Sequence, residues 1–151
     1  MADSSLHNLF VSVVLPVFDG APYLEQVVGE VVDTLHRTYT DYEVVIVDDG
    51  STDSTPALIQ ALLRTHAGLR AFSLPRRSGN RTAVAVGLDA VIGDFVVVLD
   101  PRTDPPSVIP QLVERGRAGA DVLYGVDPHA PRFSGMAAVL ANLFHLYVER
   151  F

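Results

Sequence analysis

The chain has 151 residues, which suits one domain of ordinary size, and its 48% hydrophobic and 19% charged residues exclude an intrinsically disordered polypeptide. It contains no Cys and its eleven basic residues are all Arg, which excludes disulfides, Cys-ligated zinc, thiol nucleophiles, Schiff-base chemistry and a phosphate-binding Lys of the Walker type. The formal net charge of −7 argues against a broad nucleic-acid surface, so we expect no nucleic-acid partner.

Apolar, β-branched runs alternate along the chain with segments in which apolar residues recur at helical spacing. Each run has the length of a strand, and each periodic segment has the length of a helix. In chain order, we expect a strand at Val11–Val17, a helix at Ala21–Thr38, a strand at Tyr42–Asp48, a helix from Ser54 or Thr55 to about His66, a strand at Arg70–Leu74, a helix at Thr82–Ile92, a strand at Phe95–Leu99, a helix at Ser107–Arg117, a strand at Asp121–Val126 and a helix at Ser134–Phe151.

This alternation predicts an α/β fold with a mostly parallel sheet that is sandwiched by helices. The continuous apolar strands indicate that both faces of the sheet are covered, and Phe95–Leu99 has the most strongly buried character. We predict three parts: an N-terminal tail over residues 1–10, one α/β domain over residues 11–133 and an amphipathic C-terminal helix over residues 134–151.

Polar clusters follow four of the predicted strands. They are Phe18–Gly20, Asp48–Ser51, Arg76–Arg81 and Asp100–Asp104. Right-handed crossovers bring the carboxyl ends of parallel strands to one edge of the sheet, where ligands bind in such folds. We therefore expect the four clusters to form one site.

Each cluster has a ligand-binding interpretation and a purely structural one. A carboxylate at Asp49 can accept hydrogen bonds from a ribose or from a base N–H, whereas Asp53 is better explained as a turn or helix-capping residue. Asp100 can hold Mg²⁺ or Mn²⁺, or it can belong to a turn. The three guanidinium groups of Arg76–Arg81 can bind phosphates bidentately or form a solvated loop.

The predicted helix at Ser134–Phe151 has an apolar face at helical spacing. Such a face most often packs on a sheet, and the second interpretation is contact with a membrane surface or a partner. The apolar stretch Met136–Val148 is too short to span a bilayer, and the N-terminus lacks the basic and apolar regions of a signal peptide.

Four longer motifs occur along the chain in a specific order. They are VSVVLPVFDG from residue 11, YEVVIVDDGSTDST from residue 42, GLDAVIGDFVVVLD from residue 87 and PPSVIPQLVERGRAGADVLYGV from residue 105. With these motifs the chain resembles the family 2 glycosyltransferases, which have the GT-A fold, over residues from about 11 to 126. The last motif is similar to that of the polyprenyl-phosphate sugar transferases within the family.

The resemblance implies that residues 11–133 form a nucleotide-sugar-binding domain whose donor is a nucleotide-diphosphate sugar. The implied nucleotide-binding residues are Pro16, Phe18 and Asp19 in the loop that borders the base, Asp49 as the carboxylate on base or ribose, and Gly79 and Arg81 in the loop that closes over the nucleotide. The implied catalytic residues are Asp100, as first carboxylate of the metal-binding Asp-X-Asp motif, and Arg132, as the arginine that meets an acceptor phosphate.

The chain departs from the family pattern at the metal motif, which reads Asp100-Pro101-Arg102 and lacks the second carboxylate. Asp104 is a candidate substitute, so that Asp100 and Asp104 together would hold Mg²⁺ or Mn²⁺. Arg102 is a candidate for the role of the metal in a metal-independent enzyme, because a guanidinium is always charged and can bridge diphosphate oxygens. Arg77 stands where the family has Asn.

These features predict a glycosyltransferase that moves a sugar from a nucleotide-diphosphate donor to a polyprenyl phosphate, a saccharide or another cell-envelope acceptor. Its catalytic candidates are Asp100, Arg102 and Arg132. The alternative hypothesis is a catalytically inert family 2-like domain that acts in binding or assembly, since the usual acceptor-binding part is not expected within this length. We expect a cytoplasmic location, with peripheral membrane contact through the last helix and a homo-oligomer as open possibilities.

Overall fold

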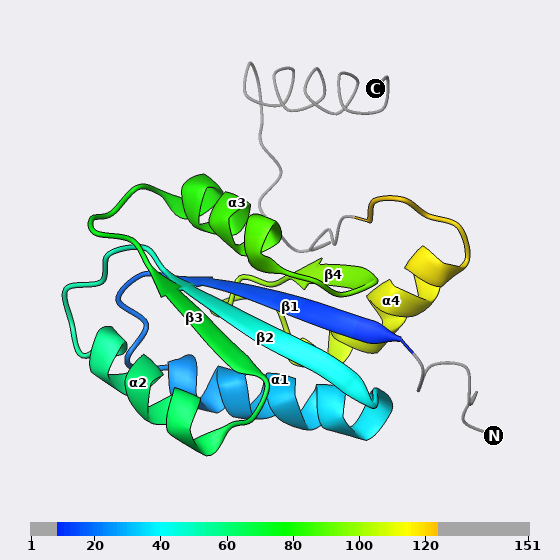
Figure 1. Ribbon diagram of the computed structural model, residues 1–151, viewed down its shortest axis with the longest axis horizontal. Coiled ribbons are helices and arrows are strands. Elements are labelled where there is room, and N and C mark those ends of the chain that lie inside the picture. The colour runs from blue at the N-terminus through cyan, green and yellow to red at the C-terminus, as the bar shows by residue number, and fades with distance from the viewer. Residues whose placement is uncertain (1–8, 124–151) are drawn as a thin grey trace, which may run out of the picture. The chain divides into compact units, whose positions relative to one another are not determined.

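Residues 9–123 are described by the computed structural model, and strands and helices alternate along them. Figure 1 shows the elements in chain order. They are β1 (Phe10–Val17), α1 (Leu24–Thr38), β2 (Asp41–Asp48), α2 (Thr55–Thr65), β3 (Leu69–Ser73), α3 (Asn80–Ala90), β4 (Phe95–Val98), the short 3₁₀ helix η2 (Pro106–Val108) and α4 (Ile109–Arg117).

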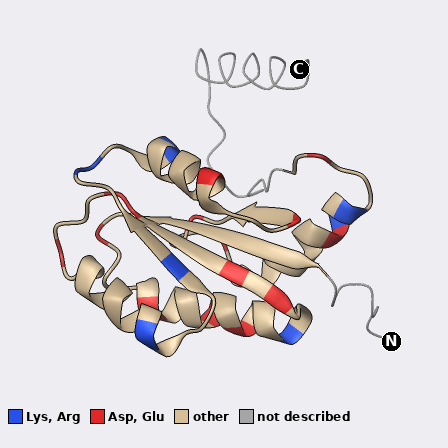
Figure 2. Cartoon of the chain, viewed as in Figure 1, with Lys and Arg blue, Asp and Glu red and all other residues tan. Residues whose placement is uncertain are grey.

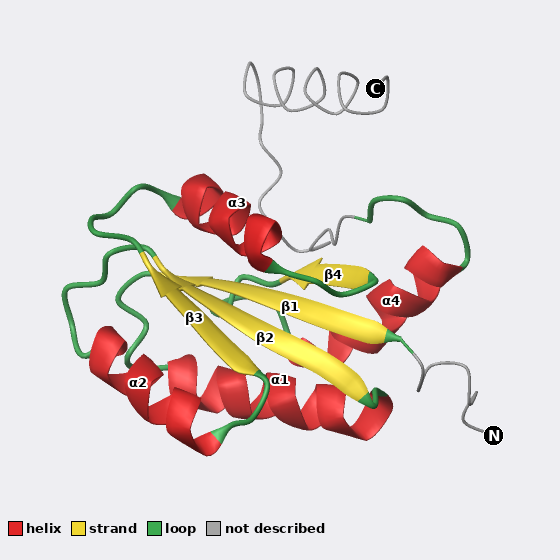
Figure 3. Ribbon diagram, viewed as in Figure 1, coloured by secondary structure: helices red, strands yellow, loops and turns green. Residues whose placement is uncertain are grey.

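Four parallel strands form the described sheet, in the spatial order β3-β2-β1-β4. Val13 of β1 lies opposite Val44 of β2 on one side and opposite Val97 of β4 on the other. Helices α1, α2 and α4 lie on one face of the sheet and α3 lies on the other (Figure 3). This arrangement confirms the predicted α/β fold, and it brings the carboxyl ends of the strands to one edge.

Side chains of the central strands alternate between the two faces, because successive residues of a strand point in opposite directions. Val13 and Leu15 pack in the layer formed with α1, α2 and α4, whereas Val45 and Val47 pack on Ala83 of α3. All five side chains are fully buried. Burial of each large apolar side chain contributes about 1.5–3 kcal/mol, which explains why most positions of both central strands are apolar.

Strand β4 is less buried than its sequence predicts. Val97 faces the layer of α1 and α4 and is buried, but Val96 and Val98 are 40% and 38% exposed. Among the described residues, α3 packs on β1 and β2 and leaves this face of β4 uncovered. The expectation that Phe95–Leu99 is the most buried strand is therefore wrong.

Three helices begin at residues other than those predicted. Helix α4 begins at Ile109 rather than Ser107, because residues 106–108 form the 3₁₀ helix η2. Helix α1 begins at Leu24 rather than Ala21, because the Gly20 carbonyl accepts hydrogen bonds from the backbone N–H groups of Tyr23 (3.1 Å) and Leu24 (2.9 Å) and closes a turn first. Helix α3 begins two residues earlier than expected, at Asn80, directly after a glycine with a φ of 97°.

Some predictions lie outside the described residues. Of the predicted strand Asp121–Val126, residues 121–123 are not in a strand, and the remainder is outside the described range. Also outside the described range are Arg132, the predicted boundary at residue 133 and the predicted helix at Ser134–Phe151. Within residues 9–123, no helix is long and apolar enough to cross a membrane.

The buried residue Glu43 ties the amino ends of the strands together, at the edge opposite the polar loops. It is 4% exposed and accepts hydrogen bonds from Ser12 Oγ of β1 (2.7 Å), Arg70 Nη1 of β3 (2.8 Å) and the backbone N–H of Ile92 (2.9 Å). Acidic and basic segments lie side by side here on β2 and β3 (Figure 2). Burial raises the pKa of Glu43, but these hydrogen bonds and the Arg70 charge outweigh it, so the pKa lies below its ordinary value.

Candidate functional site

Asp19 joins the loop after β1 to the loop after β2. Its Oδ1 accepts hydrogen bonds from the backbone N–H groups of Thr52 (2.7 Å) and Asp53 (3.3 Å), and its own N–H donates to Ser51 Oγ (2.9 Å). Asp19 has a φ of 48°, a left-handed conformation that Asp adopts more readily than most residues. The carboxylate that the sequence assigns to nucleotide binding thus holds two loops together.

Asp49 joins the loop after β2 to the third loop of the site, which connects β3 to α3 (residues 74–79). It is 4% exposed, and its two carboxylate oxygens accept hydrogen bonds from the backbone N–H groups of Ser78 (2.6 Å) and Gly79 (2.9 Å). Gly50, with a φ of 69°, lies directly under this third loop, because a Cβ at that position would be 2.6 Å from the Arg77 nitrogen. Asp49 therefore positions the third loop, and its contact with base or ribose stays a prediction.

Arg77, a residue of the third loop, stacks its guanidinium group on the aromatic ring of Phe18. The guanidinium carbon is 4.1 Å from the ring centroid, within the range of a cation–π contact. Phe18 and Arg77 both line two hollows of the surface. In the described part of the chain the Arg77 guanidinium has no hydrogen-bond or ion-pair partner, so its N–H groups are available to a ligand.

The loop after β4 is a closed turn that pairs Asp100 with Arg102. Asp100 Oδ1 accepts hydrogen bonds from Arg102 N (2.9 Å) and Nε (3.3 Å), and Oδ2 accepts one from Arg102 Nη2 (3.3 Å). Asp104 Oδ2 accepts a hydrogen bond from the Asp100 backbone N–H (2.8 Å), while the Asp104 N–H donates to the Asp100 carbonyl (3.0 Å). The Asp104 carboxylate thus closes the turn, and its role as a metal ligand stays a prediction.

This pairing shifts the ionisation of the groups involved. Burial raises the pKa of Asp100, but the hydrogen bonds and charge of Arg102 outweigh it and leave the pKa below its ordinary value. The Asp100 carboxylate in turn raises the pKa of Arg102. Burial and the surrounding carboxylates raise the pKa of Tyr23, against the opposing effect of Arg102. At neutral pH the site therefore holds an ionised Asp100, a charged Arg102 and a protonated Tyr23.

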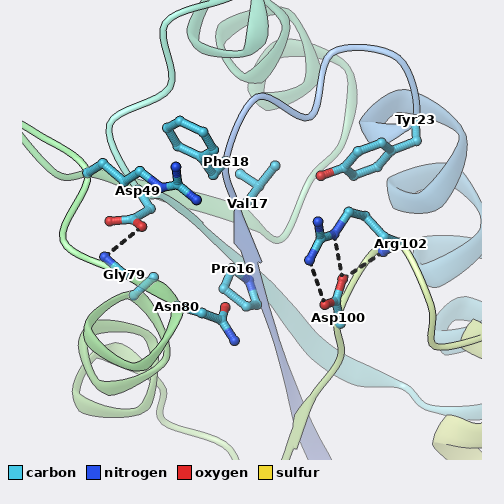
Figure 4. Close-up of a pocket in the computed structure, with 11 residues that line it drawn as sticks. Pro16, Val17, Phe18, Tyr23, Asp49, Gly79, Asn80, Asp100 and Arg102 are labelled. Carbon is cyan, nitrogen blue, oxygen red and sulfur yellow. Dashed lines mark hydrogen bonds and ion pairs between the residues drawn. The ribbon is translucent and has the colours of Figure 1, made fainter. Parts of the chain in front are cut away.

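The four loops surround a cavity of about 160 Å³ at the carboxyl edge of the sheet (Figure 4). Its lining comes from β1, the loop that leads from β1 to α1, the loops that follow β2, β3 and β4, and the first turn of α3. The lining residues are Pro16, Val17, Phe18, Tyr23, Asp49, Arg77, Gly79, Asn80, Ala83, Asp100 and Arg102.

Many residues that the sequence singles out meet in this cavity. Pro16, Phe18, Asp49, Gly79, Asp100 and Arg102 line it, whereas Asp19, Arg81 and Asp104 do not. The sequence places Asn80 in the Arg76–Arg81 cluster but gives it no role of its own. Sequence reasoning missed Tyr23, which reaches the cavity only because the chain turns before α1.

The donor set of the cavity does not fit a divalent ion. Mg²⁺ and Mn²⁺ prefer several oxygen ligands, usually with one or two carboxylates among them. Asp49 and Asp100 are the carboxylates that line the cavity, and both oxygens of each already accept hydrogen bonds from the chain. Within residues 9–123, no group of three or more His, Asp or Glu side chains is arranged to hold a metal.

Solved structures of other proteins share this fold. The chain is similar to a mannosyltransferase from Pyrobaculum calidifontis in complex with GDP-Man and Mn²⁺, with a TM-score of 0.57 and 28% identity over 63% of this chain and 28% of that one. It is similar to glucosyl-3-phosphoglycerate synthase from Mycobacterium tuberculosis, with a TM-score of 0.58 and 29% identity over 74% of this chain and 41% of that one. The fold is that of the GT-A glycosyltransferases.

The model of the family "Glycosyl transferase family 2" matches residues 12–132, and the chain belongs to that family. An undecaprenyl-phosphate 4-deoxy-4-formamido-L-arabinose transferase from Edwardsiella ictaluri is 36% identical over 76% of this chain and 36% of the relative. The protein of the same name from Pseudomonas paraeruginosa is 36% identical over 93% of this chain and 42% of the relative. The chain thus spans about two fifths of the length of these curated relatives, and the family resemblance in its sequence is confirmed.

Proposed function

We propose that this chain binds a nucleotide-diphosphate sugar and acts in a glycosyltransferase that passes the sugar to a polyprenyl phosphate or another cell-envelope acceptor. One observation carries the proposal: the loops after all four described strands converge on one cavity that is lined by Phe18, Asp49, Gly79 and Asp100. The family resemblance implies the first three of these residues for a nucleotide, and Asp100 for the metal motif. Phe18 offers an aromatic ring for stacking, and Gly79 leaves the third loop without a side chain that would obstruct a ligand.

A polyprenyl phosphate is the acceptor that the relatives favour, since two of them are named undecaprenyl-phosphate sugar transferases. In the proposed step, an acceptor phosphate oxygen attacks the anomeric carbon while the bond from that carbon to the donor diphosphate breaks. The nucleoside diphosphate leaves with the bonding electrons. A lipid phosphate is already an anion, so the step needs no general base, whereas a saccharide acceptor would need one. Arg132, outside the described residues, is the candidate that meets the acceptor phosphate.

Charge builds on the departing diphosphate in the oxocarbenium-like transition state of such a transfer. The cavity has two cations near this position, Arg77 and Arg102. Both carry fixed N–H donors that match phosphate oxygens. Asp100 binds Arg102 through both of its oxygens, so it serves as the residue that positions this donor.

The location follows from the two substrates. A nucleotide-sugar donor dissolves in water and a polyprenyl-phosphate acceptor lies in a bilayer, so the proposed transfer takes place at a membrane surface. The cytoplasmic side of that membrane stays a prediction. Peripheral contact through residues 134–151, and assembly into a homo-oligomer, stay predictions.

Calorimetric titration of the chain with UDP, GDP and their common sugar conjugates tests the proposal. Each titration is run once with Mn²⁺ and once with EDTA. We expect at least one nucleotide to bind, and Asp100→Asn to weaken binding by about tenfold or more because it loosens a charged phosphate donor. Asp89→Asn is the matched control, because Asp89 is exposed and lies outside the cavity. A folded chain that binds none of these compounds would contradict the proposal and favour the inert domain.

A further inference from the structure

We propose that Arg102 takes the place of the divalent ion at this site, so that the chain binds the diphosphate of its donor without a metal. The inference rests on the proposed function for the identity of the ligand. It goes further by assigning the source of positive charge to one residue of the chain.

The arrangement of Asp100 and Arg102 is the first argument. The guanidinium lies across the carboxylate, with Nε 3.3 Å from Oδ1 and Nη2 3.3 Å from Oδ2 (Figure 4). A metal ion that bound Asp100 would have to displace a cation already seated there. Asp104 does not line the cavity in this arrangement, and its Oδ2 accepts the hydrogen bond from the Asp100 backbone.

Charge balance is the second argument. A divalent ion held by two carboxylates has a total charge of zero, and so does Asp100 paired with Arg102. Replacing the second carboxylate and the ion together by one guanidinium therefore leaves the net charge of the site unchanged, while a cationic group still faces the cavity. With Arg102 in place of the second carboxylate of the motif, the positive charge comes from a guanidinium instead of a bound divalent ion.

The remaining donors of Arg102 are the third argument. A guanidinium has five N–H groups, and two of them donate to Asp100, which leaves three for an anion. The side chain is 67% exposed and lines the cavity, so these donors are accessible to a ligand. The bond from the Arg102 backbone N–H to Asp100 Oδ1 fixes the base of the side chain.

The fixed turn makes Arg102 a preformed donor rather than a surface side chain that samples many rotamers. The Asp100 carbonyl accepts hydrogen bonds from the N–H groups of Thr103 (3.2 Å) and Asp104 (3.0 Å), which closes the turn around Arg102. Rigid placement of a charged donor before the ligand arrives lowers the entropic cost of binding.

The test compares the wild-type chain with Arg102→Asp, which rebuilds the Asp-X-Asp pattern. The matched control is Arg115→Asp, an identical charge change at an exposed position of α4. Binding of Mn²⁺ alone is measured by electron paramagnetic resonance. Binding of UDP and GDP is measured by calorimetry in EDTA and in Mn²⁺, and circular dichroism verifies that each variant is folded.

We expect the wild-type chain and Arg115→Asp to bind nucleotide equally in EDTA and in Mn²⁺, and to bind no Mn²⁺ on their own. Arg102→Asp should lose about tenfold or more in nucleotide affinity in EDTA, recover it in Mn²⁺, and gain Mn²⁺ binding. Wild-type binding that requires Mn²⁺, or Mn²⁺ binding by the wild-type chain alone, would overturn the inference. If neither the wild-type chain nor any variant binds nucleotide, the proposed function fails, and the Mn²⁺ measurement still tests the further inference. Mn²⁺ binding gained only in Arg102→Asp supports the replacement of the ion by the Arg102 guanidinium. Any other pattern of Mn²⁺ binding refutes it.

Discussion

Replacement of Asp49 by Asn distinguishes a loop-positioning carboxylate from one that reads the nucleotide. Asp49 is almost fully buried, and its two oxygens accept the backbone N–H groups of Ser78 and Gly79. Asn has the same shape but only one acceptor oxygen. Its NH₂ group would meet a backbone N–H, so one donor would face another donor.

The expected loss follows from these two bonds. Hydrogen bonds to a charged group are worth about 1.5–3 kcal/mol each, and Asn would keep one neutral bond worth about 0.5–1.5 kcal/mol. The variant should therefore lose about 2.5–4.5 kcal/mol of its free energy of unfolding, out of the roughly 5–15 kcal/mol typical of a domain. For a chain of this size that corresponds to a melting temperature lower by roughly 5–15 °C.

Urea denaturation of the wild-type chain, Asp49→Asn and Asp89→Asn measures this loss. Asp89→Asn makes the same charge change at an exposed residue with no partner among the described residues, so it should be neutral. Nucleotide affinity should fall for Asp49→Asn with UDP and GDP alike, because the whole third loop loosens. Unchanged stability together with an altered preference between the two bases would refute the reasoning and assign the carboxylate to the ligand.

Three further substitutions test other parts of the molecule. Glu43→Gln should lower the free energy of unfolding by about 2–3 kcal/mol in urea denaturation at pH 7. Because the folded-state pKa of Glu43 lies below its ordinary value, the wild-type chain should lose this contribution as the pH falls below about 4.5. A difference between the two proteins that is equally large at low pH would contradict the role of the Glu43 charge. Arg77→Ala should weaken UDP or GDP binding by about tenfold in calorimetry, since it removes a charged donor stacked on Phe18, and unchanged affinity would place this guanidinium outside the ligand site. Gly50→Ala should lower both the melting temperature and the nucleotide affinity, because the alanine Cβ would collide with the backbone of Arg76 and the φ at this position is positive. A variant with the melting temperature and nucleotide affinity of the wild-type chain would show that the third loop can move away.

The strands were the most predictable part of the fold. β1 and β2 match the predicted ranges Val11–Val17 and Tyr42–Asp48 to within one residue, because a short run rich in β-branched residues between turn residues has few other solutions. The exposure of β4 was not predictable from its own residues. It depends on where α3 packs, and a valine-rich strand has the same sequence pattern whether one or both of its faces are covered.

The site was predictable in its location and less so in the role of each carboxylate. Parallel topology alone places Asp49 and Asp100 at one edge, and both line the cavity. The sequence does not reveal that Asp49 binds a loop thirty residues away, or that Asp104 turns back onto the Asp100 backbone. Such hydrogen bonds depend on loop geometry, which composition and periodicity do not encode.

The links made by Asp19 and Asp49 have a thermodynamic consequence for recognition. Ordering a flexible backbone costs about 1–2 kcal/mol per residue, and in this molecule that cost is met when the chain folds, since each loop is already bonded to its neighbour. A ligand therefore enters a framework that needs little further ordering. Pieces of a nucleotide, such as a nucleoside or a free diphosphate, should each bind without first having to order the loops. The whole nucleotide should then exceed the sum of its pieces only by the rigid-body entropy that it loses once and the separate pieces lose twice.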